Sequence, residues 1–359
     1  MKEVTAVLPA RNCRPWLIKC LKALSAGTMV PEIIVVDDGS EDGTSQMVKK
    51  YWPAATLLTI SAHTGYAHAA NAGLRLVRTE YAFLIRPDLR PGKHCIENLL
   101  GAVKAGTGSK KKDDGAGGVF CAVPLFVRER GAGGRLKADG SLSGKNRETL
   151  VVRDGCAMYR MKALEEIGWF DERHFDGLEA FDLSLRAALY GYRTVEATGA
   201  KVRPFACETG GQEADPEAPS HTDTFHRQLA AGNSAYVFYK NLTPLQRVLG
   251  LPLYALADLA AAGSFAGRGE SEEYRMALTR GRALCSLESE RRLALDEGVS
   301  VYPENLPDAS FLGMDEQAEG IYPLFLAEKE FFAPGRMLRY LHIQGLLTRD
   351  FRKLIRLFR

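Results

Sequence analysis

The stretch IIVVDDGSEDGT at residues 33–44 decides the fold of this chain. Its apolar, largely β-branched run ends in two adjacent aspartates, Asp37 and Asp38, with a glycine directly behind them. Such a run predicts a buried strand, and the glycine allows a sharp turn after it. Ser40 or Asp42 can then cap the helix that follows. The stretch therefore predicts a strand, a polar turn and a helix, with two carboxylates at the end of the strand.

The neighbouring segments repeat this alternation of strand and helix. Apolar runs predict strands at Val4–Leu8, Glu32–Asp37, Thr56–Ile60, Tyr81–Ile85, Val119–Val127 and Cys156–Arg160. Apolar residues at helical spacing predict helices at Trp16–Leu24, Thr44–Tyr51, Ala67–Val77, Lys162–Ile167 and Leu183–Leu189. Strands and helices in this order indicate an α/β fold with a Rossmann-like, mostly parallel sheet flanked by helices. Ligands of such sheets bind outside the carboxyl ends of the strands, where both aspartates lie.

Length and composition limit what the chain can be. A chain of 359 residues can hold one large domain and an appendage, and we expect a sheet domain at 1–225 and a mainly helical region at 226–359. The 47 basic and 44 acidic residues leave a net charge of +3, which does not suggest nucleic-acid binding. Seven scattered cysteines without metal-binding spacing fit a reducing cytoplasm. Surface loops are expected at 106–118, 131–144 and 204–225.

Three segments bear on membrane contact. The first residues, MKEVTAVLPA, hold too short an apolar stretch for a secretory signal. The apolar run Val248–Ala257, bounded by Arg247 and Asp258, is shorter than the ~20 residues that span a bilayer. The last residues, DFRKLIRLFR at 350–359, have a basic amphipathic pattern. This pattern fits a helix lying on the inner face of a membrane, and it fits equally a helix that docks on its own domain.

Five stretches together resemble a known family. They are VLPARN (7–12), IIVVDDGSEDGT (33–44), HTGYAHAANAGL (63–74), FLIRPD (83–88) and GWFDERHFDGLEAFDLSLRAALYGY (168–192). Their residues and order resemble the family 2 glycosyltransferases, which are inverting enzymes of the GT-A fold, and the rhamnosyltransferase-like members most of all. The resemblance covers about residues 3–204. It implies a GT-A domain with a C-terminal helical extension.

The resemblance also implies a site for the nucleotide-sugar donor. Pro9, Arg11, Asn12 and Asp38 match positions that hold the base and ribose, and a carboxylate suits this task because it accepts two hydrogen bonds. Asp37 is expected to be structural.

Further residues match family positions beside the nucleotide and the sugar. Gly65 and Asn71 belong to the stretch beside the nucleotide, although Gly65 can equally serve close helix packing. Gly155 and Asp171 match positions near the acceptor and the sugar, and Asp171 can equally make a turn contact. These residues complete the predicted surroundings of the donor.

The metal position departs from the family pattern. Family members carry a DxD-like motif after the fourth strand, and it binds a divalent ion such as Mg²⁺ or Mn²⁺. Here the residues are Arg86, Pro87 and Asp88, so one carboxylate remains and a cation takes the first position. One carboxylate makes a poor site for either ion. Arg203 stands where the family often has a histidine ligand, so two arginines can neutralise the diphosphate in place of an ion bound by Asp88.

The position of the catalytic base departs as well. The family's EDxDL motif reads Glu179-Ala180-Phe181-Asp182-Leu183, so alanine replaces the acid that deprotonates the acceptor. Asp176, Glu179 and Asp182 are the candidate substitutes, while Asp182 can equally cap the helix or pair with Arg173 or Arg186. General-base help is worth roughly 10² to 10⁴ in rate, so a displaced base slows transfer without abolishing it.

Two functions remain open at this point. The first is transfer of a hexose from a UDP- or dTDP-sugar to a saccharide or lipid-linked acceptor, in the synthesis of a cell-surface polysaccharide. The second is a catalytically degenerate GT-A domain that binds a nucleotide-sugar or a partner protein. The altered metal and base positions favour the second, and the preserved nucleotide motifs favour the first.

Overall fold

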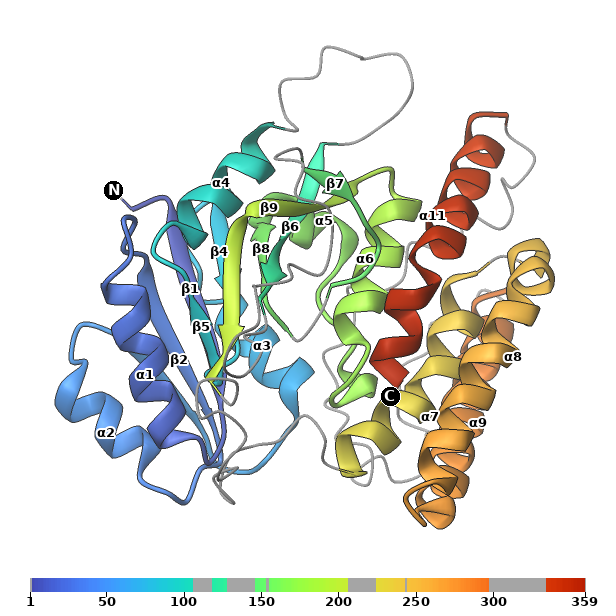
Figure 1. The fold of residues 1–359 in the computed structure, drawn as a ribbon, viewed down its shortest axis with the longest axis horizontal. Coiled ribbons are helices and arrows are strands. Elements are labelled where there is room, and N and C mark those ends of the chain that lie inside the picture. Colours follow the sequence, from blue (N-terminus) through green and yellow to red (C-terminus); the bar gives the residue numbers. More distant parts are fainter. Residues whose placement is uncertain are drawn as a thin grey trace, which may run out of the picture.

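The computed structural model describes residues 2–105, 118–127, 146–152, 155–205, 224–242, 244–296 and 334–358 (Figure 1). The loop expected at 106–118 apart from Gly118, the loop expected at 131–144, most of the segment 204–225 and Cys207 lie outside these residues. A nine-stranded sheet forms the centre of the described part, in the order β3-β2-β1-β4-β8-β6-β9-β5, and β7 pairs with β9. The strands are β1 Val4–Ala10, β2 Glu32–Asp38, β3 Thr56–Ile60, β4 Tyr81–Leu84, β5 Leu89–Pro91, β6 Val119–Phe126, β7 Arg147–Glu148, β8 Ala157–Arg160 and β9 Arg193–Pro204.

The sheet is parallel in its first half and mixed in its second. Strands β1, β2, β3 and β4 pair in parallel, as expected. Strand β8 lies between β4 and β6 and runs antiparallel to both, while β6 and β9 are parallel. The α/β architecture is therefore confirmed, whereas the expected predominance of parallel pairs holds only for the first half. A strand that is buried on both faces has the same apolar pattern in either direction, so the sequence does not show this reversal.

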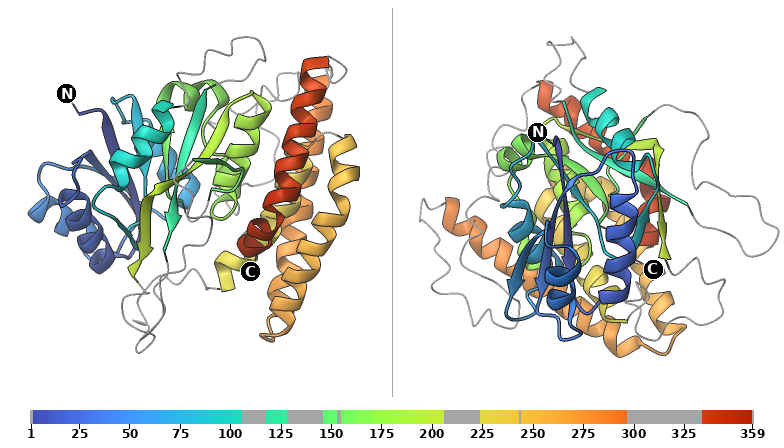
Figure 2. Two further views of the ribbon diagram at one scale, coloured as in Figure 1. Left: turned by 45° about the horizontal axis from the view of Figure 1, so that its top comes forward. Right: turned by 90° about the vertical axis from the view of Figure 1, so that its left-hand side faces the viewer.

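Helices cover both faces of the sheet (Figures 1 and 2). On one face, α1 (Arg14–Ser25), α2 (Thr44–Tyr51) and α4 (Cys95–Ala105) bury residues such as Leu17, Met47 and Leu99 in a common core. On the other face, α3 (Tyr66–Leu74), α5 (Met161–Ile167) and α6 (Glu179–Leu189) bury Ala70, Leu164 and Leu183. The two cores hold the sheet between two layers of helices.

A bundle of helices packs against α6 on the outside of this second layer (Figure 2). It consists of α7 (Thr224–Asn241), α8 (Pro244–Ala266), α9 (Ser271–Asp296) and α11 (Pro334–Phe358). Phe181 and Leu185 of α6 share a third apolar core with Val237 of α7 and Leu347 of α11. The helical nature of the C-terminal region is confirmed, and the bundle is attached to the helix that carries the predicted catalytic acids.

Helix α8 extends beyond the apolar run Val248–Ala257 at both ends. The apolar run does not end at Asp258, because the helix continues to Ala266 and Gln246–Ala266 is long and apolar enough to cross a membrane by length and composition. The carboxylate of Asp258 accepts a hydrogen bond from the hydroxyl of Tyr274 at 2.7 Å, so this acid does not interrupt the helix. At the end of the chain, Phe351 of α11 packs against the third core, and the side chains from Leu354 onward lie outside the described set.

Candidate functional site

Four loops meet at one edge of the sheet, beyond the carboxyl ends of β1 to β4. The parallel register places Ala10 beside Asp37 and Asp38 beside Ile60, so the loops after β1, β2 and β3 begin at the same level. The first two loops are tied together, because the backbone amide of Asn12 donates to the Ser40 hydroxyl at 3.0 Å. In return, the amide of Glu41 donates to the Asn12 side chain at 2.8 Å. Pro9, Arg11 and Asn12 are thus held at the edge where a ligand is expected.

Asp37 has a structural role, as the sequence predicts. Its carboxylate accepts a hydrogen bond from the backbone amide of Ser40 at 3.0 Å and another from the hydroxyl of Ser45. The side chain is buried. Asp37 therefore fixes the turn after β2 and ties it to the first turn of α2.

Asp38 holds the loop that precedes α3. One carboxylate oxygen accepts from the amide and hydroxyl of Thr64 at 2.8 and 2.7 Å, and the other accepts from the amide of Gly65 at 3.1 Å. The second oxygen also lies 2.7 Å from Nδ1 of His63. Burial alone would raise the pKa of Asp38, but these hydrogen bonds and the charge of His63 outweigh it and lower the pKa below its usual value. The aspartate is therefore ionised near neutral pH. Its side chain is buried, with only 3% of the residue exposed.

Gly65 permits a close contact at the start of α3. Its φ is +94°, and a Cβ at this position would lie 2.6 Å from the ring of Phe175. The carbonyl of Phe175 accepts from the amide of Ala67 at 3.0 Å. Phe175 and Leu178 themselves have positive φ values, of 60° and 68°. The segment before α6 is therefore pressed against the start of α3 in a strained conformation, which brings two regions of distant sequence to one place.

Asn71 does not face the nucleotide edge. Its carboxamide donates to the carbonyl of Phe170 at 3.0 Å and to the Glu172 carboxylate at 2.7 Å, and it accepts from the amide of Phe170 at 3.0 Å. The residue is 1% exposed. Asn71 thus clamps α3 to the segment before α6.

Arg86, Tyr66 and Gly155 lie together. The hydroxyl of Tyr66 donates to the carbonyl of Gly155 at 3.1 Å, and the guanidinium carbon of Arg86 lies 5.8 Å from the centre of the tyrosine ring. Nε of Arg86 is 3.4 Å from the Asp88 carboxylate. Gly155 has a φ of +54°, and a Cβ there would lie 2.3 Å from the Tyr66 hydroxyl. Only glycine fits this contact.

Arg203 approaches the same edge from β9. It pairs with Arg90 in the antiparallel ladder of β5 and β9, one residue before the strand's end. The amide of Phe205 donates to the carbonyl of Asp88 at 3.0 Å, so the end of β9 is fixed to the loop after β4. The two arginines of the sequence prediction, Arg86 and Arg203, therefore belong to adjoining segments.

Glu179 is the buried acid of this region. It is 6% exposed, and none of the described residues donates a hydrogen bond to its Oε2. Burial and the nearby Asp176 carboxylate raise the pKa of Glu179 to about 7, although the charge of Arg86 lowers it in part. Burial and the charge of Glu179 raise the pKa of Tyr66 well above its usual value, while the charge of Arg86 lowers it in part. A carboxyl group with such a pKa can take up and release a proton near neutrality.

Asp182 is enclosed in a different network. It lies 3.0 Å from Nε of Arg186 and 2.7 Å from Nζ of Lys240, and it accepts from the Asn241 carboxamide at 2.6 Å. Burial alone would raise its pKa, but the charges of Lys240 and Arg186 lower it well below the usual range. The residue is fully buried. The pairing with Arg186, expected as one alternative, is present, and it leaves Asp182 unsuited to receive a proton from an acceptor.

Asp171 shares the same lysine. Nζ of Lys240 lies 2.7 Å from its carboxylate, and the Tyr236 hydroxyl donates to it at 2.8 Å. Asp171, His174 and Asp182 have ligand atoms within 4.8 Å of one another, a spacing that suits a metal ion. The lysine ammonium, however, already bridges the two carboxylates. A cation of the protein therefore takes the place that a metal would need.

The metal position on β4 also fits a divalent ion poorly. Asp88 offers one carboxylate, and Arg86 lies beside it at 3.4 Å. Mg²⁺ and Mn²⁺ prefer several oxygen ligands, and a neighbouring guanidinium opposes their charge. The arrangement suits a phosphate group better, because arginine forms bidentate hydrogen bonds with phosphate oxygens.

Tyr66 and Lys240 are not predicted by the sequence. Tyr66 follows the glycine of HTGY, and its ring meets Arg86 only because the loops after β3 and β4 come together in the fold. Lys240 lies far along the chain from Asp171 and Asp182, in a helix without a recognisable motif. No pattern in the sequence joins such distant residues.

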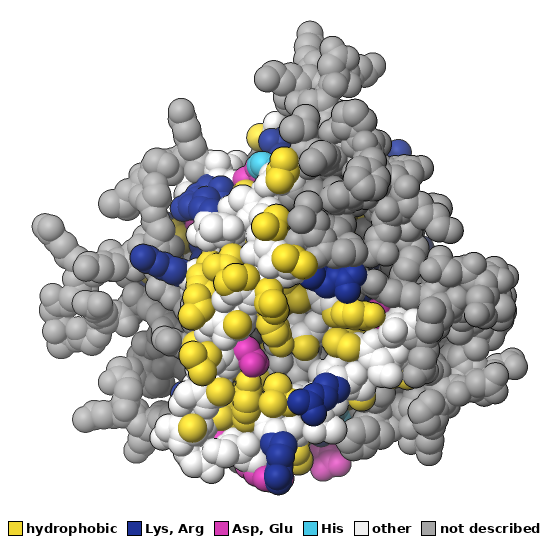
Figure 3. All heavy atoms as spheres, turned by 90° about the vertical axis from the view of Figure 1, so that its right-hand side faces the viewer, with side chains coloured by type: hydrophobic (Ala, Val, Ile, Leu, Met, Phe, Trp, Pro, Cys, Tyr) yellow, Lys and Arg dark blue, Asp and Glu magenta, His cyan; other side chains and the backbone are white. Residues whose placement is uncertain are grey.

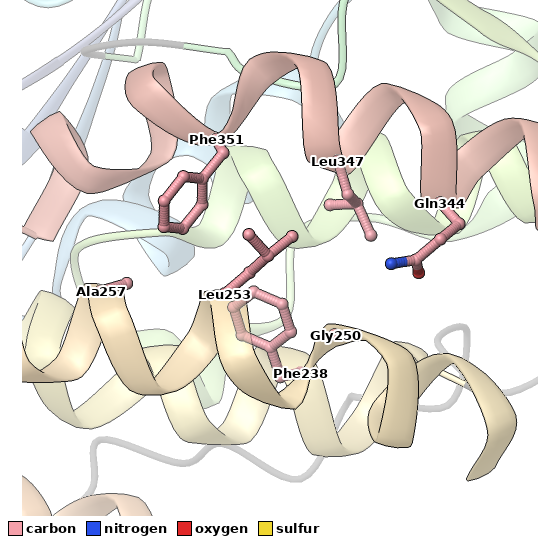
Figure 4. A pocket seen from close by; sticks show the side chains of 7 residues that line it. All are labelled: Phe238, Gly250, Leu253, Ala257, Gln344, Leu347 and Phe351. Atoms are coloured by element: carbon pink, nitrogen blue, oxygen red, sulfur yellow. The ribbon is translucent and has the colours of Figure 1, made fainter.

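A small apolar pocket lies away from this site, between α7, α8 and α11 (Figure 4). It is lined by Phe238, Gly250, Leu253, Ala257, Gln344, Leu347 and Phe351. The pocket leaves about 10 Å³ for the centre of a water molecule, so it has room for a single water. The pocket belongs to the packing of the helical bundle.

A family model matches the first half of the chain, which holds most of the sheet. Residues 5–168 match the model of the family described as "Glycosyl transferase family 2". Residues 5–168 are therefore similar to the family 2 glycosyltransferases, and the fold is that of a GT-A-type sheet domain with C-terminal helices.

Three relatives extend this finding. The chain is 27% identical over 256 residues to an N-acetylglucosaminyl-diphospho-decaprenol L-rhamnosyltransferase of Mycobacterium tuberculosis, covering 62% of this chain and 82% of the relative. It is 24% identical over 231 residues to the uncharacterized glycosyltransferase YaiP of Escherichia coli, covering 58% of this chain and 54% of that protein. The crystal structure of S. aureus TarS 1-349 in complex with UDP-GlcNAc superposes with a TM-score of 0.53 at 15% identity, covering 98% of this chain and 92% of that one. This last likeness concerns the fold.

Proposed function

We propose that the chain transfers a hexose from a UDP- or dTDP-sugar, with inversion, to a hydroxyl of a saccharide or lipid-linked acceptor. The observation that carries this proposal is the buried Glu179, whose pKa is raised to about 7 beside Tyr66 and Arg86. An acid of this kind at the carboxyl edge of the sheet is suited to general-base catalysis. The relative of M. tuberculosis is named for a decaprenol-linked acceptor, which supports an acceptor of the lipid-linked class.

The proposed reaction needs a base for the acceptor hydroxyl and cationic groups for the departing diphosphate. The acceptor hydroxyl attacks the anomeric carbon, its proton passes to the Glu179 carboxylate, and the bond from that carbon to the diphosphate oxygen breaks. Arg86 and Arg203 are the groups that stabilise the charge of the departing diphosphate. Asp88 orients Arg86 through their contact at 3.4 Å. Glu179 takes the role of the missing acid at position 180, from the preceding residue.

The nucleoside half of the donor belongs to the loops after β1, β2 and β3 in this proposal. Pro9, Arg11 and Asn12 form one side. Asp38 holds the loop at 63–65 as the opposite side, since both of its oxygens bond to residues of that loop. Gly65 and Gly155 allow the close contacts that shape the site. Asn71 and Asp182 are not part of it, because their polar atoms bond to other parts of the protein.

The proposed place of action is the cytoplasmic side of a membrane, in the synthesis of a cell-surface polysaccharide. A lipid-linked acceptor lies at a membrane, and nucleotide-sugars are made in the cytoplasm. The sheet domain at 1–225 is proposed to carry the donor site, and the helices at 226–359 are proposed to position α6. The contacts of Lys240 and Asn241 with Asp182 support this division of roles.

A degenerate domain that binds a nucleotide-sugar without transferring it is the second candidate. Ala180 at the family's base position favours it. The two candidates differ in one measurable product, the free nucleoside diphosphate. Incubation of the protein with a panel of UDP- and dTDP-hexoses and a prenyl-diphosphate-linked sugar should release the diphosphate and give a glycoside of inverted configuration by NMR. Donor binding without release, over prolonged incubation with the whole panel, would favour the degenerate domain.

A further inference from the structure

The outer face of α8 carries large apolar side chains in contact with solvent. Val248, Leu249, Leu251, Leu256 and Leu259 are 70%, 49%, 61%, 55% and 69% exposed. The opposite side of the helix is buried, with Ala257 in the third core and Ala261 beside it. Figure 3 shows the hydrophobic side chains gathered in the middle of this face of the molecule. Contiguous exposed apolar surface of this kind marks an interaction site.

Basic side chains lie at the edge of the patch (Figure 3). Within the described side chains of 225–289 and 341–353, the exposed charged residues are five arginines and one glutamate: Arg268, Arg275, Arg282, Arg349, Arg352 and Glu272. Glu272 pairs with Arg275, and the one acid of α8, Asp258, accepts from Tyr274 and is half-buried. Figure 3 shows Lys and Arg side chains at the edge of the apolar area. Among the described side chains of these helices, the exposed charges are therefore mainly positive.

The neighbouring helices decide how α8 can meet a membrane. Although α8 is long enough to span a bilayer, α9 packs along it and carries many charges, including Glu272, Glu273 and Arg275. Helix α11 covers part of its inner side. A spanning orientation would take these charges into the hydrocarbon, which is costly. An orientation parallel to the surface buries the leucines and leaves the charges in water.

We propose that α8 docks flat on an anionic lipid membrane, with Leu256 and Leu259 inserted among the acyl chains. The arginines around the patch attract an anionic headgroup layer, and they would repel the same arginines of a second copy placed face to face. Charge therefore favours lipid over self-association. Docking through α8 is distinct from the contact first expected from the tail at 350–359, and it requires neither donor nor acceptor.

Vesicle flotation tests this docking directly. Full-length protein is mixed with vesicles of phosphatidylcholine, with or without phosphatidylglycerol, in the absence of sugars. The wild type should float with the phosphatidylglycerol vesicles, and much less with phosphatidylcholine alone. L256E/L259E should reduce the vesicle-bound fraction about tenfold or more, since both charges would have to enter the interface. Both side chains are exposed, so the fold should persist, and thermal melting checks this.

The controls separate the alternatives. Y51E changes an exposed aromatic residue of α2, 58% exposed, and should float as the wild type does. If L256E/L259E unfolds, V248Q/L251Q replaces it and should show the same loss. Equal flotation of wild type and these variants, or no binding of wild type to either vesicle, would overturn the proposal. A dimer in light scattering that L256E/L259E abolishes, without vesicle binding, would also overturn it and assign the patch to self-association. Sugar transfer to a soluble acceptor should be unaffected in every case.

Discussion

At the residue scale, two acids of α6 lie in opposite environments. Glu179 is buried near the carboxylate of Asp176, and both effects raise its pKa to about 7. Asp182, three residues later, is buried against Arg186 and Lys240, which lowers its pKa. Environment alone therefore separates a proton acceptor from a structural anion on one helix.

The first prediction concerns the E179Q variant. Glutamine keeps the shape of the side chain but cannot accept the acceptor's proton, so kcat should fall roughly 10²- to 10⁴-fold. Donor affinity, measured by calorimetry, should stay within about threefold, since the charge of Glu179 opposes donor phosphate only weakly. E165Q on the exposed face of α5 is the matched control and should leave kcat unchanged. Unchanged turnover in E179Q would exclude Glu179 as the base.

The second prediction concerns the pH dependence of the same residue. A base must be deprotonated to act, so kcat/KM should rise with pH up to about 7 and level off above it. The stability of the folded state changes with pH in the opposite direction. The folded pKa lies above the unfolded value of 4.5, so the folded state binds more protons in between and its stability decreases as pH rises from 4.5 to about 7. Rate profiles of wild type and E179Q check this, and a rising limb that persists in E179Q would contradict it.

The sequence predicted the residues at strand ends better than those on helices. Asp37 and Asp38 lie where the strand pattern placed them, because a buried strand fixes the position of its last residue. Asn71 was assigned to the nucleotide, but it clamps Phe170 and Glu172. Which face of α3 meets the segment before α6 depends on long-range packing. A local pattern does not contain that information.

At the scale of elements, the turns that bring strands and helices together depend on glycines. Gly65 and Gly155 both have positive φ values, and each lies against an aromatic side chain where a Cβ would collide. The segment before α6 and the loop before β8 can therefore approach the start of α3 closely. The order of strands and helices in the first half followed from the sequence, whereas the antiparallel insertion of β8 did not, since buried strands look alike in both directions.

The third prediction compares two glycine substitutions. In G155A the new Cβ would lie 2.3 Å from the Tyr66 hydroxyl, at a φ of +54°, so the free energy of unfolding should fall by about 1–3 kcal/mol. Transfer should also slow, because Tyr66 and Arg86 must shift. G101A lies inside α4 with open space around it and should stabilise by about 0.5–1 kcal/mol. Urea unfolding measures both; equal stability of the two variants would refute the contact at Gly155.

At the scale of the whole molecule, the C-terminal bundle packs against α6, the helix that carries Glu179. Lys240 and Asn241 of α7 contact Asp182 of α6, and Lys240 also bridges to Asp171. The apolar core of α6, α7 and α11 surrounds this polar network. The composition of the C-terminal region predicted helices, but not this attachment, because the partners are separated by more than fifty residues.

The fourth prediction tests the attachment with K240M. Methionine fills the space of the lysine stem but leaves Asp171 and Asp182 buried without their shared cation, which should cost about 3–5 kcal/mol. K49M changes an exposed lysine of α2 and should cost less than about 0.5 kcal/mol. Denaturant unfolding of both variants provides the measurement. If K240M is as stable as K49M, the bridge does not stabilise the attachment of the bundle.

The most direct test of the whole account is calorimetric titration of the wild type and D38N with UDP and dTDP, in the presence of EDTA. The wild type should bind at least one of the two nucleotides at one site per chain, because the arginines rather than a metal ion meet the diphosphate. D38N disrupts the loop at 63–65 and should weaken binding by about tenfold or more, as expected for charge-assisted hydrogen bonds of about 1.5–3 kcal/mol. No heat of binding with either nucleotide, with or without added Mn²⁺, would contradict a nucleotide-sugar site at this edge of the sheet.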